Sequence, residues 1–498
     1  MKRTSLLRRY MAGILGVSYL MFTLSSCSKS FLNQTPKDGA PTSTAITSEA
    51  TMYTAILGLY SSMRATDFYG RTYAIKGDLM ADNAFLSSSN SGRYLGFNNY
   101  DMDKTNAYPR DCWSNAYAGI KNANFIINCG LPNTNNPISH MYAEAYALRG
   151  LFLFDLARNY SMPYAAGADN DGVPIVKFFD YKALPARSKV GEVYTQILSD
   201  LDSALLLSKY AQTATMAFTS TGVNRTMNYT FVTKYVIEAL QARVYQHMGN
   251  WQAVHDKAQD IVDNGGYSLA TSTALVGYWQ NAGVSNDKIE TMFEVTSDAN
   301  NNVADGTLAN IYVPKPLGSY GDILATKAFY DSYSPTDARK SLYNPSTRSG
   351  QLGTAYYVTK YPIDVVNYDD VKIVRFAEVL LMLAESYYNL NDETNALKYL
   401  NMVAKQRDPS FAGYASTGAQ VLEDILNERA KELAFEGYRF WDLYRLQRTF
   451  VHPQSQDGTN AINKSVTVTP GTTVNFIFPI PNNERLLNPN VSQNPGYN

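Results

Sequence analysis

Two stretches of this chain follow one helix–turn–helix pattern, which constrains the fold more than any other feature. They span residues 242–262 (ARVYQHMGNWQAVHDKAQDIV) and 384–404 (AESYYNLNDETNALKYLNMVA). An alanine, an aromatic residue and a polar turn hold equivalent places in both: Ala242, Tyr245 and Gly249-Asn250 in the first, and Ala384, Tyr387 and Asn391-Asp392 in the second. A small residue lets two helices approach, the aromatic ring fills the gap one turn later, and the turn reverses the chain. We therefore predict helical hairpins at 231–264 and 372–407.

Four further helices are predicted from apolar residues that recur every three or four positions, the spacing of one helix face. The four segments are 49–64, 113–129, 139–158 and 189–207. With the two hairpins they make about four helix pairs, an arrangement similar to tetratricopeptide repeats although the pairs are not contiguous. The expected fold class is mainly α, with a tetratricopeptide-like scaffold of helical hairpins and a loop-rich inserted subdomain.

Long irregular segments separate the helix pairs at 65–112, 159–188 and 265–371, and a tail begins at Phe450. Segments longer than about 15 residues in a compact protein are usually functional or disordered. Aromatic residues make up 13% of the chain and are frequent in these segments, which is atypical of disorder. We therefore expect ordered loops, some of whose aromatic rings bind a ligand. Residues 464–479 alternate like a strand and predict a small hairpin or a strand packed on the helices.

The first 27 residues, MKRTSLLRRYMAGILGVSYLMFTLSSC, have the features of a bacterial lipoprotein signal. Basic residues precede an apolar run from Tyr10 to Leu24, which is shorter than a membrane span of about 20 residues, and Cys27 closes the cleavage box. The alternative, an uncleaved transmembrane anchor, lacks a basic flank after the apolar run. We predict lipidation at Cys27 and attachment to the outer membrane.

These boundaries define the expected domain organisation. It comprises a signal peptide (1–26), a tether (27–48), an N-terminal helical part (49–264) with a loop insert (65–112), a loop-rich subdomain (265–371), C-terminal helical hairpins (372–449) and a C-terminal extension packed on the scaffold (450–498).

Charge and motifs exclude several functions. Removal of the signal peptide takes four of the 43 basic residues and none of the 44 acidic ones, so the net charge becomes −5 and no basic surface for nucleic acid is expected. The four histidines lack metal-ligand spacing, and nucleophile-elbow and phosphate-loop motifs are missing. The sequence Asp169-Asn170-Asp171-Gly172 lacks the Glu that completes a calcium loop, so we predict a turn, with no metal and no cofactor. Cys112 and Cys129 lie about 25 Å apart by helical rise and are expected to be buried free thiols.

The segment ERAKELAFEGYRFWDLYRL (428–446) repeats a carboxylate every four residues, at Glu428, Glu432 and Glu436. Catalysis by carboxylates needs an aligned pair about 5 to 10 Å apart in a cleft. Helical carboxylates beside arginines more often form ion pairs, which we expect here with Arg375 and Arg429. Tyr438 and Trp441 are assigned to the helical core.

Several blocks, in order along the chain, resemble the SusD/RagB family of outer-membrane lipoproteins of Bacteroidetes-type bacteria. They are FLNQTP (31–36), ADN (81–83), AEAYALRGLFLFDLARNYSMPY (143–164), GVPIV (172–176), RFAEVLLMLAESYYNL (375–390), ERAKELAFEGYRFWDLYRL (428–446) and PIPNNERLLNPNVSQNPGY (479–497). The resemblance implies a non-catalytic protein that binds oligosaccharides or other polysaccharide-derived nutrients. It also implies a position facing the cell surface and delivery of these nutrients to a SusC-like TonB-dependent transporter.

Two other functions are compatible with parts of the sequence. Tetratricopeptide surfaces commonly bind proteins, so the alternative is an assembly scaffold of the outer membrane. A surface glycoside hydrolase is disfavoured by the lack of catalytic motifs.

The resemblance also suggests where a ligand binds, since family members gather ligand-facing aromatics from the first insert and the inserted subdomain. The corresponding candidates are Tyr69, Tyr94, Phe97 and Tyr100 in the first, and Tyr278, Trp279, Tyr312 and Tyr320 in the second. Trp279 is the leading candidate because Trp has the largest stacking face and lies here in a loop bounded by Gly and Asn (VGYWQNAG). The alternative for each ring is a hydrophobic plug beneath a loop.

Overall fold

The computed structural model describes residues 45–498 except 181, 219–221, 223, 281–288, 299, 315–317, 349–352, 363–368, 458–464 and 498. Residues Ser48–Asn498 form one compact unit, separate from the chain before them. The predicted signal segment and Cys27 lie outside the described residues. The finer division at 265, 372 and 450 stays a prediction.

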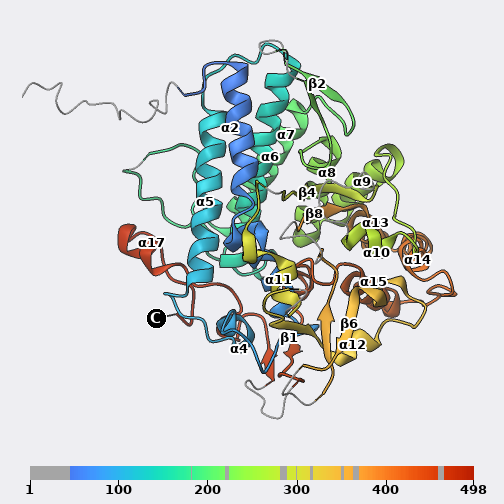
Figure 1. Cartoon of the computed structure of the whole chain (residues 1–498). Coiled ribbons are helices and arrows are strands. Elements are labelled where there is room, and N and C mark those ends of the chain that lie inside the picture. The colour runs from blue at the N-terminus through green and yellow to red at the C-terminus, as the bar shows by residue number, and fades with distance from the viewer. Residues whose placement is uncertain are drawn as a thin grey trace, which may run out of the picture. The chain divides into compact units, whose positions relative to one another are not determined.

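The scaffold is helical, as predicted, and its long helices pack in sequential pairs. They are α2 (Glu49–Ser62), α5 (Ala107–Ile127), α6 (Asn136–Tyr160), α7 (Val190–Leu207), α8 (Lys234–Met248), α9 (Trp251–Asn264), α13 (Phe376–Asn389), α14 (Glu393–Arg407) and α15 (Ala419–Glu432). Helices α2, α5, α6 and α7 lie side by side, α8 packs on α9, and α13 packs on α14 (Figure 1). The tetratricopeptide-like fold class is thereby confirmed.

The two hairpins identified in the sequence end their first helices in the same way. Gly249 and Asn391 both adopt left-handed backbone conformations, with φ of 73° and 63°. Gly and Asn are the residues that tolerate this conformation at a helix end. Asn250 and Asp392 then begin the second helices, and each side chain accepts a hydrogen bond from the backbone N–H three residues on. Helix α9 also packs on α13, which brings the hairpins together.

The first insert is more regular than predicted. It contains α3 (Thr72–Leu79), β1 (Ala84–Leu86) and α4 (Leu95–Asn99), and α5 begins six residues before the predicted helix. The side chain of Asn106 caps α5, and Pro109 lies in its first turn, where a missing N–H costs nothing. Cys112 is buried in α5, whereas Cys129 lies partly exposed after its end; both are free thiols.

Short strands join the inserts to the scaffold. An antiparallel four-stranded sheet has the order β1, β5 (Ile323–Ala325), β7 (Ala355–Val358) and β6 (Tyr343–Ser346), so the first and third inserts share one sheet. Three two-stranded sheets pair β2 (Thr215–Ala217) with β3 (Asn224–Thr226), β4 (Thr291–Val295) with β8 (Val371–Arg375), and β9 (Phe450–His452) with β10 (Val466–Val468). In the tail, the predicted strand character of 464–479 is confirmed only for β10, and its partner β9 lies before the predicted segment. The helix predicted from 372 is wrong at its start, because β-branched residues favour strand β8 there.

A buried ionic cluster links α15 to the inserted subdomain and to α14. It contains Glu290, Arg339, Arg375, Arg407, Glu428, Glu432 and Glu436. Glu432 lies 3.0 Å from Arg375 Nη1 and 2.9 Å from Arg407 Nη2. The predicted pairing with Arg375 is confirmed, but that with Arg429 is wrong, because Arg429 faces away from this cluster and pairs with Asp442. All three repeated carboxylates are bound to cations in the core.

Trp441 occupies the core, as predicted, whereas Tyr438 is only half-buried. Trp441, in α16 (Arg439–Arg445), is 2% exposed, and its ring lies between the cationic groups of Lys76 and Arg158. Half-buried Tyr438 donates a hydrogen bond to Ile373 O at 3.0 Å.

Candidate functional site

An arginine and a tyrosine from the first and third inserts stack at the protein surface. The guanidinium carbon of Arg93 lies 3.9 Å from the centre of the Tyr320 ring, and Arg93 Nη2 donates a hydrogen bond to the Tyr320 hydroxyl at 3.1 Å. Both side chains are half-exposed. With half-exposed Tyr108 and Arg348 they define a set that we call the Arg93–Tyr320 surface.

The backbone beneath this surface is strained at two tyrosines. Tyr94 and Tyr100 flank the short helix α4 and have φ of 57° and 55°. A bulky residue with positive φ is uncommon and persists only where its surroundings fix it. The ring of Tyr94 stacks on that of Tyr108 at 4.3 Å between centres, and its hydroxyl accepts a hydrogen bond from Arg71 Nε at 2.8 Å. The strained turn therefore fixes the position of Arg93, and the stacked Tyr94 ring supports that of Tyr108.

Hydrogen bonds fasten the second half of the surface to the first. Arg348 donates to the backbone oxygens of Gly321, at 2.8 Å, and Tyr320, at 3.1 Å. Its Nη1 also donates to Ser87 Oγ at 3.0 Å. The backbone N–H of Ser91 donates to Asp322 Oδ1 at 3.1 Å. Segments more than 200 residues apart are thus held in one geometry before any ligand arrives.

The Arg93–Tyr320 surface combines aromatic faces with hydrogen-bond donors. Tyrosine offers an apolar ring and a polar hydroxyl, and a guanidinium carries several donors in a fixed plane. Partial burial raises the pKa of Tyr108, so its hydroxyl stays neutral near neutral pH. This combination suits a ligand with apolar faces and hydroxyl groups.

The eight aromatic residues predicted to bind a ligand lie in different surroundings in the structure. Tyr320 is half-exposed within the Arg93–Tyr320 surface, and Tyr94 and Phe97 lie directly beneath it. Tyr312 packs on Tyr361 and Phe435 in the core. The hydroxyl of buried Tyr100 donates to Met80 O.

Trp279 and Tyr278 lie in α10 (Leu275–Gln280), so the expected loop position of Trp279 is wrong. Both rings are 3% exposed. Trp279 is covered by the ammonium groups of Lys360 and Lys372, at 4.0 and 4.4 Å from the ring. Ligand contact by these buried rings stays a prediction, which their burial disfavours.

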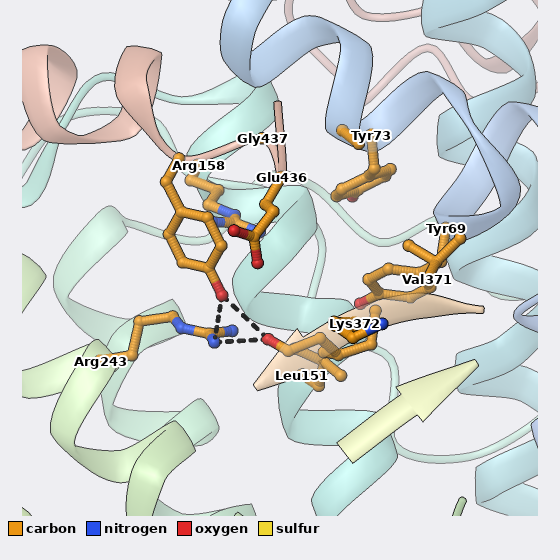
Figure 2. A pocket seen from close by; sticks show the side chains of 12 residues that line it. Tyr69, Tyr73, Leu151, Arg158, Arg243, Val371, Lys372, Glu436 and Gly437 are labelled. Carbon is orange, nitrogen blue, oxygen red and sulfur yellow. Dashed lines mark hydrogen bonds between the residues drawn. The ribbon is translucent and has the colours of Figure 1, made fainter. Parts of the chain in front are cut away.

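Tyr69 is buried and lines a small cavity. The cavity has a volume of about 40 Å³, and Figure 2 shows Tyr69 and Tyr73 on one side of it and Arg243 on the other. The Tyr69 hydroxyl bonds to Asp155, while that of Tyr73 is buried without a protein partner. Such a volume holds a few waters but no sugar ring.

Sequence reasoning missed Arg93, Tyr108 and Arg348. Arg93 adjoins a predicted site residue, and Tyr108 belongs to the same aromatic-rich insert, so both carried a weak signal. Arg348 had none, because only tertiary contacts bring it to Tyr320.

Within the described part of the chain, no three His, Cys, Asp or Glu side chains converge to hold a metal ion. The Asp169–Gly172 turn is tied by an ion pair between Asp171 and Lys189 at 2.8 Å. None of the helices that the structure describes combines the length and the apolarity needed to cross a bilayer.

Family models match most of the chain. The SusD family model matches residues 354–497, and a model described as "Starch-binding associating with outer membrane" matches residues 30–229. SusD-like protein P2 of Formosa agariphila is 25% identical over 96% of this chain and 98% of its own length, and SusD-like protein P25 of the same organism is 24% identical over 86% and 88%.

Solved structures share the fold. A candidate sugar-binding protein of Bacteroides vulgatus has a TM-score of 0.80 at 26% identity, covering 91% of this chain and all of its own. A SusD superfamily protein of Bacteroides thetaiotaomicron has a TM-score of 0.78 at 24% identity, covering 90% of this chain and all of its own. The chain belongs to the SusD/RagB family.

Proposed function

We propose that this protein binds oligosaccharides or other polysaccharide-derived nutrients at the Arg93–Tyr320 surface, without catalysis. The observation that carries the proposal is the half-exposed Tyr320 ring held against the Arg93 guanidinium at 3.9 Å. Family membership and the similarity to a candidate sugar-binding protein support the choice of ligand class.

The chemistry of the surface favours a sugar over a wholly apolar ligand. A pyranose ring has an apolar face that packs on tyrosine and a rim of hydroxyls that bond to guanidinium and phenol groups. The positive charge of Arg93 and Arg348 also suits sugars that carry carboxylate or sulfate groups.

A non-catalytic role is supported by the burial and ionisation of the three regularly spaced carboxylates, which are the best candidates for a catalytic acid pair. Glu428, Glu432 and Glu436 are buried and bound to arginine or lysine. Although burial raises it, nearby Arg407 and Arg375 hold the pKa of Glu432 well below its usual range. A carboxylate that stays ionised cannot donate the proton that glycoside cleavage requires.

In this proposal Cys27 carries the lipid anchor in the outer membrane, and bound sugar passes to a SusC-like TonB-dependent transporter. The lipoprotein signal and the outer-membrane description of the matching family model support this arrangement. Copurification of the transporter with the lipidated protein from outer membranes would test the partnership.

The binding proposal is tested by calorimetric titration with the polysaccharide that induces expression of the operon encoding this protein. Wild type is compared with Tyr320→Ala and Arg93→Ala. Loss of one stacking contact should weaken binding by about 1 to 2 kcal/mol, roughly ten- to thirtyfold. Tyr330→Ala is the matched control, because Tyr330 is another half-exposed tyrosine beside a cation, Lys340 at 4.7 Å.

Three results would overturn the proposal. Wild-type affinity in both variants would move the site elsewhere. Release of reducing ends during the titration would establish a glycoside hydrolase. Transporter association without affinity for any glycan would favour the assembly scaffold.

A further inference from the structure

Five large apolar side chains stand out from two segments that are remote in sequence. They are Phe178, Phe179 and Leu184, at 67%, 54% and 47% exposure, and Leu486 and Leu487 of α17 (Asn482–Leu487), at 75% and 79%. We call them the two-segment apolar patch. Single exposed apolar residues are ordinary, but exposed apolar side chains on two adjoining segments mark an interaction site.

Specific hydrogen bonds hold the two segments together. Asn490 Nδ2 donates to Leu184 O at 2.7 Å, and Asn488 Nδ2 donates to Pro185 O at 2.9 Å. Leu184 and Pro185 are therefore held beside the end of α17.

Both segments are also fastened to α5. Asn124 Nδ2 donates to Val176 O at 2.9 Å, and the Phe125 ring contacts Phe179 at 5.3 Å between centres. At the other end of α5, Trp113 Nε1 donates to Glu484 at 3.3 Å, which turns the polar side of α17 inward and leaves Leu486 and Leu487 outward. In Figure 1 the connection between α6 and α7 and the helix α17 lie on the same side of α5.

The composition around the patch favours a lipid surface as its partner. Exposed Lys177 and Lys182 and half-buried Arg485 flank the apolar tips and outnumber the acidic neighbours, Asp180 and Glu484. Phe and Leu with flanking basic residues are typical of segments that lie in the membrane interface, whereas Lys is depleted in protein interfaces. The tips project outward, which suits insertion between lipid chains.

We propose that the two-segment apolar patch inserts into the lipid surface of the membrane that carries this protein. The proposal rests on the lipid attachment at Cys27 in the proposed function. The 20 residues between Cys27 and Ser48 could span about 70 Å if extended, so the compact unit can reach the bilayer surface. The patch would then fix one face of that unit against the membrane.

The test uses the lipidated protein in vesicles of phosphatidylethanolamine and phosphatidylglycerol that contain a spin-labelled phospholipid. One environment-sensitive fluorophore is attached to Leu487→Cys in a Cys129→Ser background, since Cys112 is buried. The matched control is Leu206→Cys, because Leu206 is 77% exposed but lies in α7, outside the patch. A second labelled variant, Phe178→Cys, keeps the test valid if the first fails to fold.

Insertion predicts loss of fluorescence by lipid quenching at 487 and 178 and none at 206. Equal quenching at all three positions, or none at any, overturns the proposal. The proposal is also overturned if the fluorophore at position 487 is shielded from water in native outer membranes but not in vesicles that lack other proteins. That result would assign the patch to a protein partner. Glycan affinity measured on the same samples separates a failure of this proposal from a failure of the binding function.

Discussion

Replacement of Arg375 by Gln should destabilise the protein severely, because Arg375 is the centre of the buried ionic cluster. Its side chain is 1% exposed and donates to both carboxylate oxygens of Glu436 at 2.7 Å and to Glu432 at 3.0 Å. It also pairs with Glu290. Removing the guanidinium leaves the buried cluster one positive charge short, although Lys360 and Arg407 still pair with the same carboxylates.

The magnitude follows from the cost of such burial. Breaking a buried ion pair by removing one partner costs about 3 to 5 kcal/mol, whereas an exposed pair is worth about 0 to 1 kcal/mol. The matched control is therefore Arg448→Gln, whose pair with Glu423 is 36% and 43% exposed.

Urea unfolding measures the difference. With slopes of about 1 to 3 kcal/mol per molar urea, Arg375→Gln should lower the midpoint by roughly 1 to 5 M, while Arg448→Gln should barely move it. Equal midpoints for the two variants would refute the reasoning that the cluster is structural.

Three further predictions concern the core, acid stability and the anchor. Trp441→Ala should cost about 3 to 5 kcal/mol in urea unfolding, with wild-type sugar affinity in the fraction that folds; unchanged stability with lost affinity would make Trp441 a ligand residue. Burial lowers the pKa of His140 to about 4, below its unfolded value near 6.5, so its contribution to stability is present above pH 6.5 and is lost as pH falls towards 4. Gln does not titrate in this range, and its side-chain oxygen can still accept the Lys209 N–H that His140 Nδ1 accepts at 3.1 Å. His140→Gln should therefore reduce the loss of stability between pH 7 and 5 by about 2 kcal/mol, and an unaltered pH profile would contradict this. Cys27→Ala should abolish fatty-acid labelling and fractionation with outer membranes; continued labelling would show another attachment site.

The helical scaffold could be predicted because its signal is local. Apolar spacing located α2, α6 and α7, and the turn residues Gly249 and Asn391 located two hairpins. Strand β8 was missed because its partner, β4, lies about 80 residues earlier, and a short apolar run reads equally well as the start of a helix.

The site was only partly predictable, since exposure depends on contacts between distant segments. Trp279 and Tyr320 are both aromatic residues of the same insert, yet Lys360 and Lys372 cover the first while the second meets Arg93 at the surface. Tyr320 and Arg93 are 227 residues apart, and no local pattern links them. Composition indicated that some rings would bind a ligand, but it could not say which.

A crystal structure of the protein with an oligosaccharide from the inducing polysaccharide tests the central claim most directly. The account predicts a sugar ring packed against Tyr320, with hydroxyls within hydrogen-bond distance of Arg93, Arg348 or Tyr108. A sugar bound elsewhere, with the Arg93–Tyr320 surface left bare, would contradict it.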